Sequence, residues 1–291
     1  MIKFDCIGCN IDQVNKIIKL LDLPREQGEK IVRAVLGYLS SADYTKSNPQ
    51  IMGVTWGIIC GFIGNEDPYK NIKIHYNSEM LKMYNEIIDI IEASENKFIT
   101  ALKIAITGNL IDFAANYSFS MEELKQKISG GKNLQLDIDQ SNELYNKLKG
   151  ARSLLYIGDN CGEIVLDKIF IEIIKNEFPG IDIFYGVRGK PVLNDITMED
   201  ARMVEMEKAA KVIENGDGSS GTVLSLVSGE FRKIFNDADV IISKGQANYE
   251  SLQTAGREGI FFLFMAKCEL VAEPLGVNTK SIVCIEQKKV I

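Results

Sequence analysis

Residues 153–163 read SLLYIGDNCGE, and this stretch decides how the second half of the chain folds. Five mostly apolar residues end abruptly at Gly158, and the polar pair Asp159 and Asn160 follows directly. An apolar run of this length is typical of a buried strand, and Gly, Asp and Asn are typical of a turn. A turn alone accounts for these residue types, so the other strands must show whether the polar pair has a further role.

The chain divides near residue 150 into two parts with different hydrophobic periods. Residues 11–150 place apolar side chains at helical spacing almost throughout. From residue 151 onward, helical stretches alternate with short runs rich in Ile, Val, Phe and Tyr: SLLYI (153–157), IDIFYGV (181–187), KVIEN (211–215), ADVIIS (238–243), EGIFFLFM (258–265) and SIVCI (281–285). Such alternation predicts a mostly parallel sheet covered by helices on both faces. We therefore expect an α/β fold, with a helical domain over residues 1–150 and a three-layer α/β/α domain over residues 151–291.

The composition excludes several classes of protein. A chain of 291 residues, 46% of them hydrophobic, is long enough to bury a large core. The net charge of -7 argues against nucleic-acid binding, which normally needs a basic surface. The sequence shows no apolar run long enough to span a membrane, and its start lacks the apolar core of a signal peptide. We predict a cytoplasmic protein without nucleic-acid or membrane partners, and the sequence leaves its oligomeric state open.

Two of the six cysteines, Cys6 and Cys9, form a CxxC pair at the N-terminus. A zinc site needs about four ligands, and His75 is the sole histidine in the sequence. The pair therefore favours a structural or redox role over metal binding. We also predict that it is not catalytic.

Polar side chains follow four of the predicted strands. They are Asp159 and Asn160 after the first strand, Arg188 and Asp195 after the second, and Lys244 and Asn248 after the fourth. The third strand opens into a Gly/Ser loop in which Gly218 and Gly221 would let the backbone approach a bound group. In an open parallel sheet, ligands bind beyond the carboxyl ends of the strands. We therefore expect these groups to meet at one edge of the sheet.

The chemistry of these groups suits a phosphate and a hard divalent cation. Carboxylate and amide oxygens are the ligands that magnesium and manganese prefer. Lys244 offers a point charge to a phosphoryl oxygen, and Arg188 and Asn248 complete the predicted substrate-binding set. Cys161, Gly162 and Glu163 begin a helix, and the backbone N–H groups of a helix N-terminus bind anions. Each residue alone also has a structural explanation, such as a turn, a surface lysine, or a cap of the next helix for Asp195.

Longer motifs resemble the metal-dependent damage-control phosphatases, a family long catalogued as a domain of unknown function. The resemblance rests on GDNCGE (158–163), VRGKPVLNDITMEDA (187–201), NGDGSSGTVL (215–224) and KGQANYESL (244–252). CIGC (6–9), NEDPYKNIK (65–73) and TGNLIDF (107–113) extend it to the first half of the chain. These last motifs are similar to the branch of the family that has an N-terminal cysteine pair.

The resemblance implies a helical domain that caps an α/β/α domain, with a divalent metal at their junction. The metal would be manganese, cobalt, nickel or magnesium, held by Asp159, Asn160 and Asp195. Some relatives carry an aspartate where this chain has Gln246, so the resemblance does not carry the substrate preference across.

The same resemblance implies catalytic roles for Asn109, Asp112, Asp195 and Lys244. Asn109 and Asp112 would lie over the metal, and Lys244 matches the lysine of the family's late motif. Asp195 and Asp112 are both candidates to orient an attacking water, and direct attack by Asp159 also stays open.

We therefore predict a metal-dependent phosphomonoester hydrolase that acts on small phosphorylated metabolites, such as sugar phosphates or damaged phosphometabolites. One alternative is an S-adenosylmethionine-dependent methyltransferase, because a strand, a glycine and a helix with a nearby acid also form a cofactor site. The other is a non-catalytic metabolite-binding protein, with Cys6 and Cys9 acting as a sensor.

Overall fold

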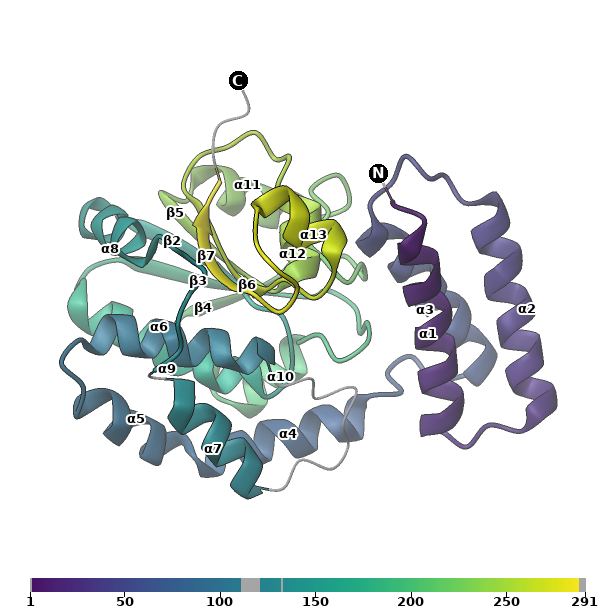
Figure 1. The fold of residues 1–291 in the computed structure, drawn as a ribbon, viewed down its shortest axis with the longest axis horizontal. Helices are drawn as coiled ribbons and strands as arrows, with labels where there is room; N and C mark the ends of the chain where they lie inside the picture. The colour runs from purple at the N-terminus through teal and green to yellow at the C-terminus, as the bar shows by residue number, and fades with distance from the viewer. Residues whose placement is uncertain (1, 111–120, 132, 288–291) are drawn as a thin grey trace.

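The computed structural model describes residues 2–110, 121–131 and 133–287 (Figure 1). In chain order its elements are α1 (Asp5–Leu20), α2 (Arg25–Ser41), α3 (Asn48–Ile63), α4 (Lys70–Lys82), α5 (Tyr84–Glu92), α6 (Lys97–Thr107), η1 (Gly108–Leu110), α7 (Met121–Gly131), β1 (Ile138–Asp139), α8 (Ser141–Gly150), β2 (Ser153–Ile157), α9 (Glu163–Glu177), β3 (Asp182–Val187), α10 (Met198–Met203), η2 (Met206–Lys208), β4 (Lys211–Glu214), α11 (Gly229–Asp237), β5 (Val240–Lys244), α12 (Gln246–Leu252), β6 (Ile260–Met265), α13 (Glu269–Leu275) and β7 (Ile282–Glu286). Within these residues, no helix is both long and apolar enough to cross a membrane.

One seven-stranded sheet forms the centre of the molecule, in the order β1-β7-β6-β5-β2-β3-β4. All neighbouring strands are parallel except β6 and β7, which are antiparallel. The predicted α/β fold with a mostly parallel sheet is therefore confirmed. The edge strand β1 comes from the segment before residue 151, which the sequence assigned to the helical domain.

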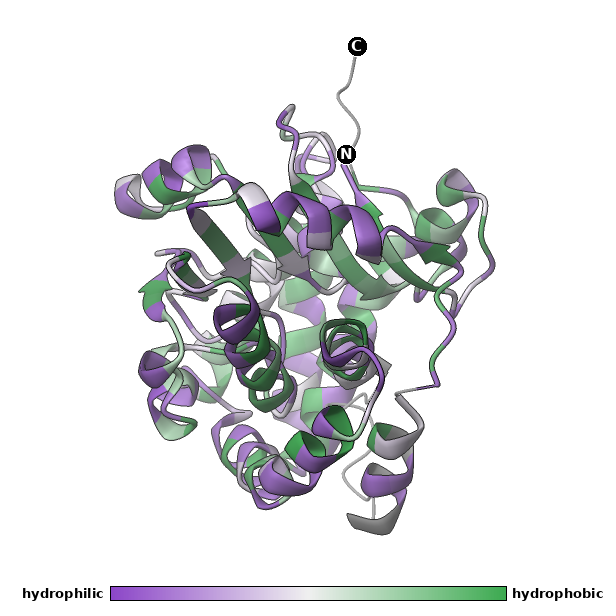
Figure 2. Cartoon of the chain, turned by 90° about the vertical axis from the view of Figure 1, so that its left-hand side faces the viewer, coloured by the Kyte–Doolittle hydropathy of each residue, from purple (hydrophilic) through white to green (hydrophobic). Residues whose placement is uncertain are grey.

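Helices cover both faces of the sheet because alternate residues of its buried strands face opposite sides. Leu154 and Tyr156 of β2 pack into a core with α6 and α9, whereas Leu155 and Ile157 pack into a second core with α11 and α12. Figure 2 shows the apolar strands between helices whose outer surfaces are hydrophilic. This arrangement leaves the strand ends as the place where polar side chains can gather.

Helices α1, α2 and α3 form a separate bundle beside the sheet (Figure 1). Its core contains Ile17, Ile31 and Val35, and also Val192 from the loop between β3 and α10. Val192 has no exposed surface, so this loop is anchored inside the helical bundle. The bundle and the sheet are therefore joined through a segment that also carries Asp195.

Candidate active site

Asp159 lies just beyond the carboxyl end of β2 and is almost fully buried, with 5% of its surface exposed. Nδ2 of Asn160 donates to Oδ2 of Asp159 at 2.6 Å, and Nδ2 of Asn109 donates to the same oxygen at 3.1 Å. Gly245 has a φ of +81°, and a Cβ at that position would lie 2.0 Å from Oδ2 of Asp159. Glycine is therefore needed there both for the backbone conformation and for the space that the carboxylate fills.

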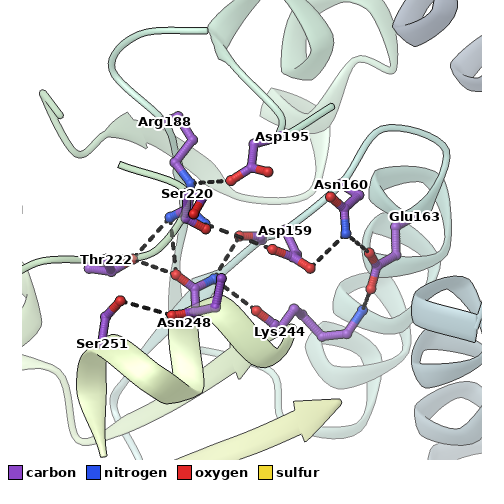
Figure 3. A network of polar contacts seen from close by, with 12 residues as sticks. Asp159, Asn160, Glu163, Arg188, Asp195, Ser220, Thr222, Lys244, Asn248 and Ser251 are labelled. Atoms are coloured by element: carbon purple, nitrogen blue, oxygen red, sulfur yellow. Dashed lines mark hydrogen bonds and ion pairs between the residues drawn. The ribbon is translucent and has the colours of Figure 1, made fainter. Parts of the chain in front are cut away.

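Asp195 reaches the same place from the loop between β3 and α10. The N–H of Ile196 donates to the C=O of Asp159 at 3.0 Å. Asn160 and Asp195 form an antiparallel bridge beside this bond. The expectation that these two strand ends meet at one edge of the sheet is confirmed by these contacts (Figure 3).

Asp195 does not cap the helix that follows it. The N-cap of α10 is Thr197, which forms a capping box with Asp200. The carboxylate of Asp200 accepts from the N–H of Thr197 at 2.8 Å and from its hydroxyl at 2.9 Å. The explanation of Asp195 as a simple helix cap is therefore wrong, because two other residues supply the cap.

The Arg188 guanidinium lies between the two aspartates and is 2% exposed. Its Nε donates to Oδ2 of Asp195 at 2.7 Å, and its Nη2 lies 3.8 Å from Oδ1 of Asp159. Its remaining donors reach Thr222 Oγ1, Asn248 Oδ1 and the C=O of Ser220. Arg188 thus balances part of the carboxylate charge and holds the loop after β4 in place. The predicted contact of Arg188 with substrate stays a prediction.

Burial dominates the electrostatics of the aspartate pair. It raises the pKa of Asp159 to about 8, and repulsion from Asp195 and Glu163 adds to the shift. Burial also raises the pKa of Asp195 to about 6, although the Arg188 guanidinium acts in the opposite direction. Lys267 lowers both pKa values to a lesser extent, so its charge lies within electrostatic reach of the pair. An additional cation between the two carboxylates would offset their repulsion.

The residues at this edge fit a hard divalent cation. Within the described ranges, no three His, Cys, Asp or Glu side chains form a metal cluster. A cation site at this edge would therefore combine the two carboxylates of Asp159 and Asp195 with the amide of Asn160. Nδ2 of Asn160 donates to Asp159 and to Glu163, which leaves its Oδ1 as the remaining ligand atom. Two carboxylates and one amide oxygen suit magnesium or manganese, with water or substrate oxygens completing the coordination.

Lys244 is fully buried at the end of β5. Its Nζ donates to Oε1 of Glu163 at 2.8 Å, to Oδ1 of Asp167 at 2.7 Å and to the C=O of Ala105 at 2.9 Å. Burial alone would lower the pKa of Lys244, but the two carboxylates raise it above its usual value. An ammonium has three N–H donors, and all three have protein acceptors here. The predicted contact of Lys244 with a phosphoryl oxygen therefore stays a prediction.

The start of α9 also has protein partners for its backbone donors. The N–H of Cys161 donates to the C=O of Asn194 at 3.0 Å. The N–H of Gly162 donates to Oδ1 of Asn77 at 2.6 Å. Two of these backbone donors thus have acceptors within the protein. The expected contact of Cys161, Gly162 and Glu163 with a phosphate stays a prediction.

Asn248 is fully buried and links the site to neighbouring segments. Its Oδ1 accepts from Nη1 of Arg188 at 3.0 Å and from Oγ1 of Thr222 at 2.9 Å. Its Nδ2 donates to the C=O groups of Gly158 and Lys244 at 3.2 and 2.8 Å. Every polar atom of this amide has a partner in the protein, and its predicted contact with substrate stays a prediction.

The helical part of the chain contributes Asn109, which is 3% exposed. Besides its bond to Asp159, its Oδ1 accepts from the N–H of Met265 at 3.2 Å. This segment therefore reaches the carboxyl edge of the sheet, as the sequence motif implied. Asp112, predicted to lie over the same site, falls outside the described residues.

Sequence reasoning missed Asp167 and Lys267. Asp167 binds Lys244 and also accepts from the hydroxyls of Tyr156 and Tyr185 at 2.7 and 2.9 Å. Its signal was a second carboxylate, four residues after Glu163, in the mostly apolar start of a helix, EIVLD. Lys267 lies two residues after the end of β6, so the strand-end rule used for the other strands would have found it.

Comparison with known proteins identifies the family. The chain matches the family model of the damage-control phosphatase ARMT1-like domain over residues 2–283. The chain belongs to this family. The family predicted from the sequence motifs is thereby confirmed, and membership of the branch with an N-terminal cysteine pair stays a prediction.

Individual relatives agree with the family assignment. A damage-control phosphatase of Pyrococcus horikoshii is 35% identical over 289 residues, which cover 99% of this chain and 98% of that protein. A damage-control phosphatase of Archaeoglobus fulgidus is 34% identical over 227 residues, or 76% of each chain. The crystal structure of a DUF89 family protein from Pyrococcus horikoshii has a TM-score of 0.88 to this chain at 34% identity, and covers 99% of both. These findings do not favour a methyltransferase or a non-catalytic binding protein.

Proposed function

We propose that the protein is a metal-dependent phosphatase that hydrolyses phosphomonoesters of small metabolites. The observation that carries the proposal is the meeting of Asp159 and Asp195 at the carboxyl edge of the sheet, with Asn160 beside them. The names of the relatives that match most of the chain support the phosphatase activity. Sugar phosphates and damaged phosphometabolites are the proposed substrate class.

Asp159, Asn160 and Asp195 would hold the divalent cation, for which magnesium, manganese, cobalt and nickel are the candidates. When bound, such a cation neutralises charge on the phosphoryl oxygens and lowers the pKa of a water molecule. The protein's own part is to orient the ligands. Arg188 holds Oδ2 of Asp195, and two amides hold Oδ2 of Asp159. Oδ1 of each aspartate is therefore the oxygen with the fewer hydrogen bonds.

A carboxylate must also orient the attacking water. Asp195 and Asp112 are the candidates, and direct attack on phosphorus by Asp159 is the alternative. Asn109 lies three residues before Asp112 in the chain, and the side-chain amide of Asn109 donates to Asp159 at 3.1 Å. This contact supports Asp112 as a candidate.

A phosphate dianion needs a cationic side chain whose N–H donors are not already bonded to protein acceptors. The ammonium of Lys244 and the guanidinium of Arg188 direct their donors at protein oxygens. Lys267 is exposed, and among the described residues its ammonium has no hydrogen-bond partner. We assign the phosphate contact to Lys267, while Lys244 keeps Glu163 in position beside Asn160.

The test is hydrolysis of p-nitrophenyl phosphate by protein stripped of metal with a chelator. We expect background turnover in the stripped protein and recovery on addition of one of the four cations. Bis(p-nitrophenyl) phosphate is the matched control, because a phosphomonoester hydrolase should leave this diester intact. Full turnover after stripping, with the absence of metal confirmed by elemental analysis, would contradict the metal assignment. Ligand binding without turnover under every metal would favour a binding protein.

A further inference from the structure

Asn77, on α4, connects the two turns that carry the candidate metal ligands. Its side chain has no exposed surface. Its Oδ1 accepts from the N–H of Gly162 at 2.6 Å, and its Nδ2 donates to Oδ1 of Asp200 at 2.9 Å. The two ends of one short amide thus hold two segments that are far apart in the sequence.

Each anchor lies next to a candidate ligand. Gly162 lies two residues after Asn160, and it forms the N-cap of α9 with a φ of +73°. Asp200 belongs to the capping box of α10, shortly after Asp195 in the chain. Figure 1 shows α4 below α9 and α10. The hydrogen bonds of Asn77 to Gly162 and Asp200 connect α4 to the starts of both helices.

The tie that Asn77 makes is additional to the backbone contact between the turns. The backbone bonds from Ile196 to Asp159 and from Cys161 to Asn194 join the turns directly, whereas Asn77 joins the elements that follow them from outside. Lys73, on the same helix, also contacts Asp200. Its Nζ lies 3.3 Å from Oδ2 of Asp200 and 2.7 Å from Oδ2 of Asp67. Loss of the Asn77 amide would leave a buried N–H and a buried carboxylate oxygen without this partner, which is costly inside a protein.

We propose that Asn77 is a positioning residue that sets the separation of Asp159 and Asn160 from Asp195. It does so by fixing the start of α9 against the capping box of α10. The inference rests on the proposed function, because it takes these three residues to bind one divalent cation. Groups that orient metal ligands typically change metal affinity or activity by about 10- to 100-fold when they are removed.

The first test compares Asn77→Ala with a matched control, Asn10→Ala. Asn10 is also a fully buried helical asparagine, and it makes three hydrogen bonds, to the C=O of Cys6, to Asn48 and from Thr55. Both variants lose buried hydrogen bonds, so both should lower thermal stability. We expect Asn77→Ala to weaken manganese binding by about 10- to 100-fold in a calorimetric titration. Asn10→Ala should stay within about twofold of wild type, because distant sites act independently.

A paired exchange tests the geometry itself. Asn77→Asp keeps the acceptor for Gly162 but sets a carboxylate against that of Asp200, so it should weaken manganese binding as Asn77→Ala does. Adding Asp200→Asn restores a donor and an acceptor to the contact, because the new amide nitrogen faces the new carboxylate. The double variant should therefore regain most of the lost manganese affinity and turnover.

The outcomes separate this inference from the proposed function. If wild-type protein binds no manganese and shows no metal-dependent turnover, the proposed function fails and the inference fails with it. If wild type behaves as proposed but folded Asn77→Ala binds manganese normally, only the inference is overturned. An equal loss of manganese affinity in Asn10→Ala, or no recovery of that affinity in the paired exchange, would likewise show that Asn77 contributes to general stability alone.

Discussion

The carboxylate of Asp195 meets a guanidinium on one side and a second carboxylate on the other. Oδ2 accepts from Arg188, and the carboxyl group of Asp159 lies within electrostatic reach. An asparagine at position 195 can still accept the hydrogen bond from Arg188, but it removes the charge that a cation needs. The fold and the metal site therefore respond differently to this single change.

We predict that Asp195→Asn keeps the fold and loses function. Metal affinity should fall, and turnover should drop by about two orders of magnitude or more, because a charged ligand is replaced by a neutral one. Circular dichroism, a calorimetric metal titration and initial rates would be measured on the same preparation. Wild-type affinity and turnover in the folded variant would remove Asp195 from the site.

Lys267 and Lys244 differ in what surrounds their ammonium groups. We predict that Lys267→Gln lowers kcat/KM by about 10- to 100-fold, the value of a hydrogen bond to a charged group, mainly through KM. Lys233→Gln, on the exposed face of α11, is the matched control and should leave kcat/KM unchanged. If Lys267→Gln also behaves as wild type, the phosphate contact returns to Lys244.

At the level of elements, the loop between β3 and α10 depends on the helical bundle. Val192 is buried in the core of that bundle, and its C=O accepts from the N–H of Asp195 at 3.0 Å. Leu193, between them, has a φ of +48°, a conformation that a leucine rarely adopts without support from its surroundings. The packing of Val192 therefore helps to fix where Asp195 lies.

We predict that Val192→Ala and Val35→Ala are equally destabilising but affect the site differently. Both valines are fully buried in the same core, so each truncation should cost about 2 kcal/mol of unfolding free energy. Only Val192→Ala should weaken metal binding, because Val192 lies in the loop that carries Asp195, whereas Val35 lies on α2. Denaturant unfolding and a metal titration of both variants would check this. Equal metal affinity in the two would mean that the loop holds its shape without the bundle.

The local sequence predicts elements well when their burial is regular. The apolar runs of β2, β3, β5 and β6 were visible because each is buried over most of its length. The two residues of β1 carry no such pattern, and only their pairing with β7 makes them a strand. Val192 likewise reads as an ordinary loop residue, since nothing nearby in the chain reveals the core that receives it.

The same limit applies to the site. The strand-end rule brought Asp159, Asn160 and Asp195 together, because the ends of parallel strands share one edge whatever the details. It could not show that Glu163 and Asp167 take up the charge of Lys244, because that depends on how a helix packs over the sheet. The topology of the sheet therefore predicted where the site residues lie, but it did not predict which groups pair with each charged side chain.

Across the whole molecule, the helical bundle also meets the α/β layers through the start of α1. A cavity of about 330 Å³ lies there, lined by Cys6, Glu250 and Cys268 among others. None of the candidate metal ligands lines this cavity. Partial burial raises the pKa of each thiol, Cys6 and Cys9, above the usual value for cysteine. Both thiols therefore stay protonated and weakly nucleophilic at neutral pH.

We predict that replacing Cys6 and Cys9 together by serine leaves turnover within about threefold of wild type, because phosphoryl transfer between oxygen groups has no step that needs a thiolate. Thermal stability should fall somewhat, since Cys6 packs against the bundle core. Cys60→Ser is the matched control, because Cys60 is a half-buried thiol that packs against the same core. Complete loss of turnover in the folded double variant, with Cys60→Ser active, would place the cysteine pair in the chemistry. A loss of turnover in both the double variant and Cys60→Ser would instead mean that the bundle must pack correctly for Asp195 to hold its position.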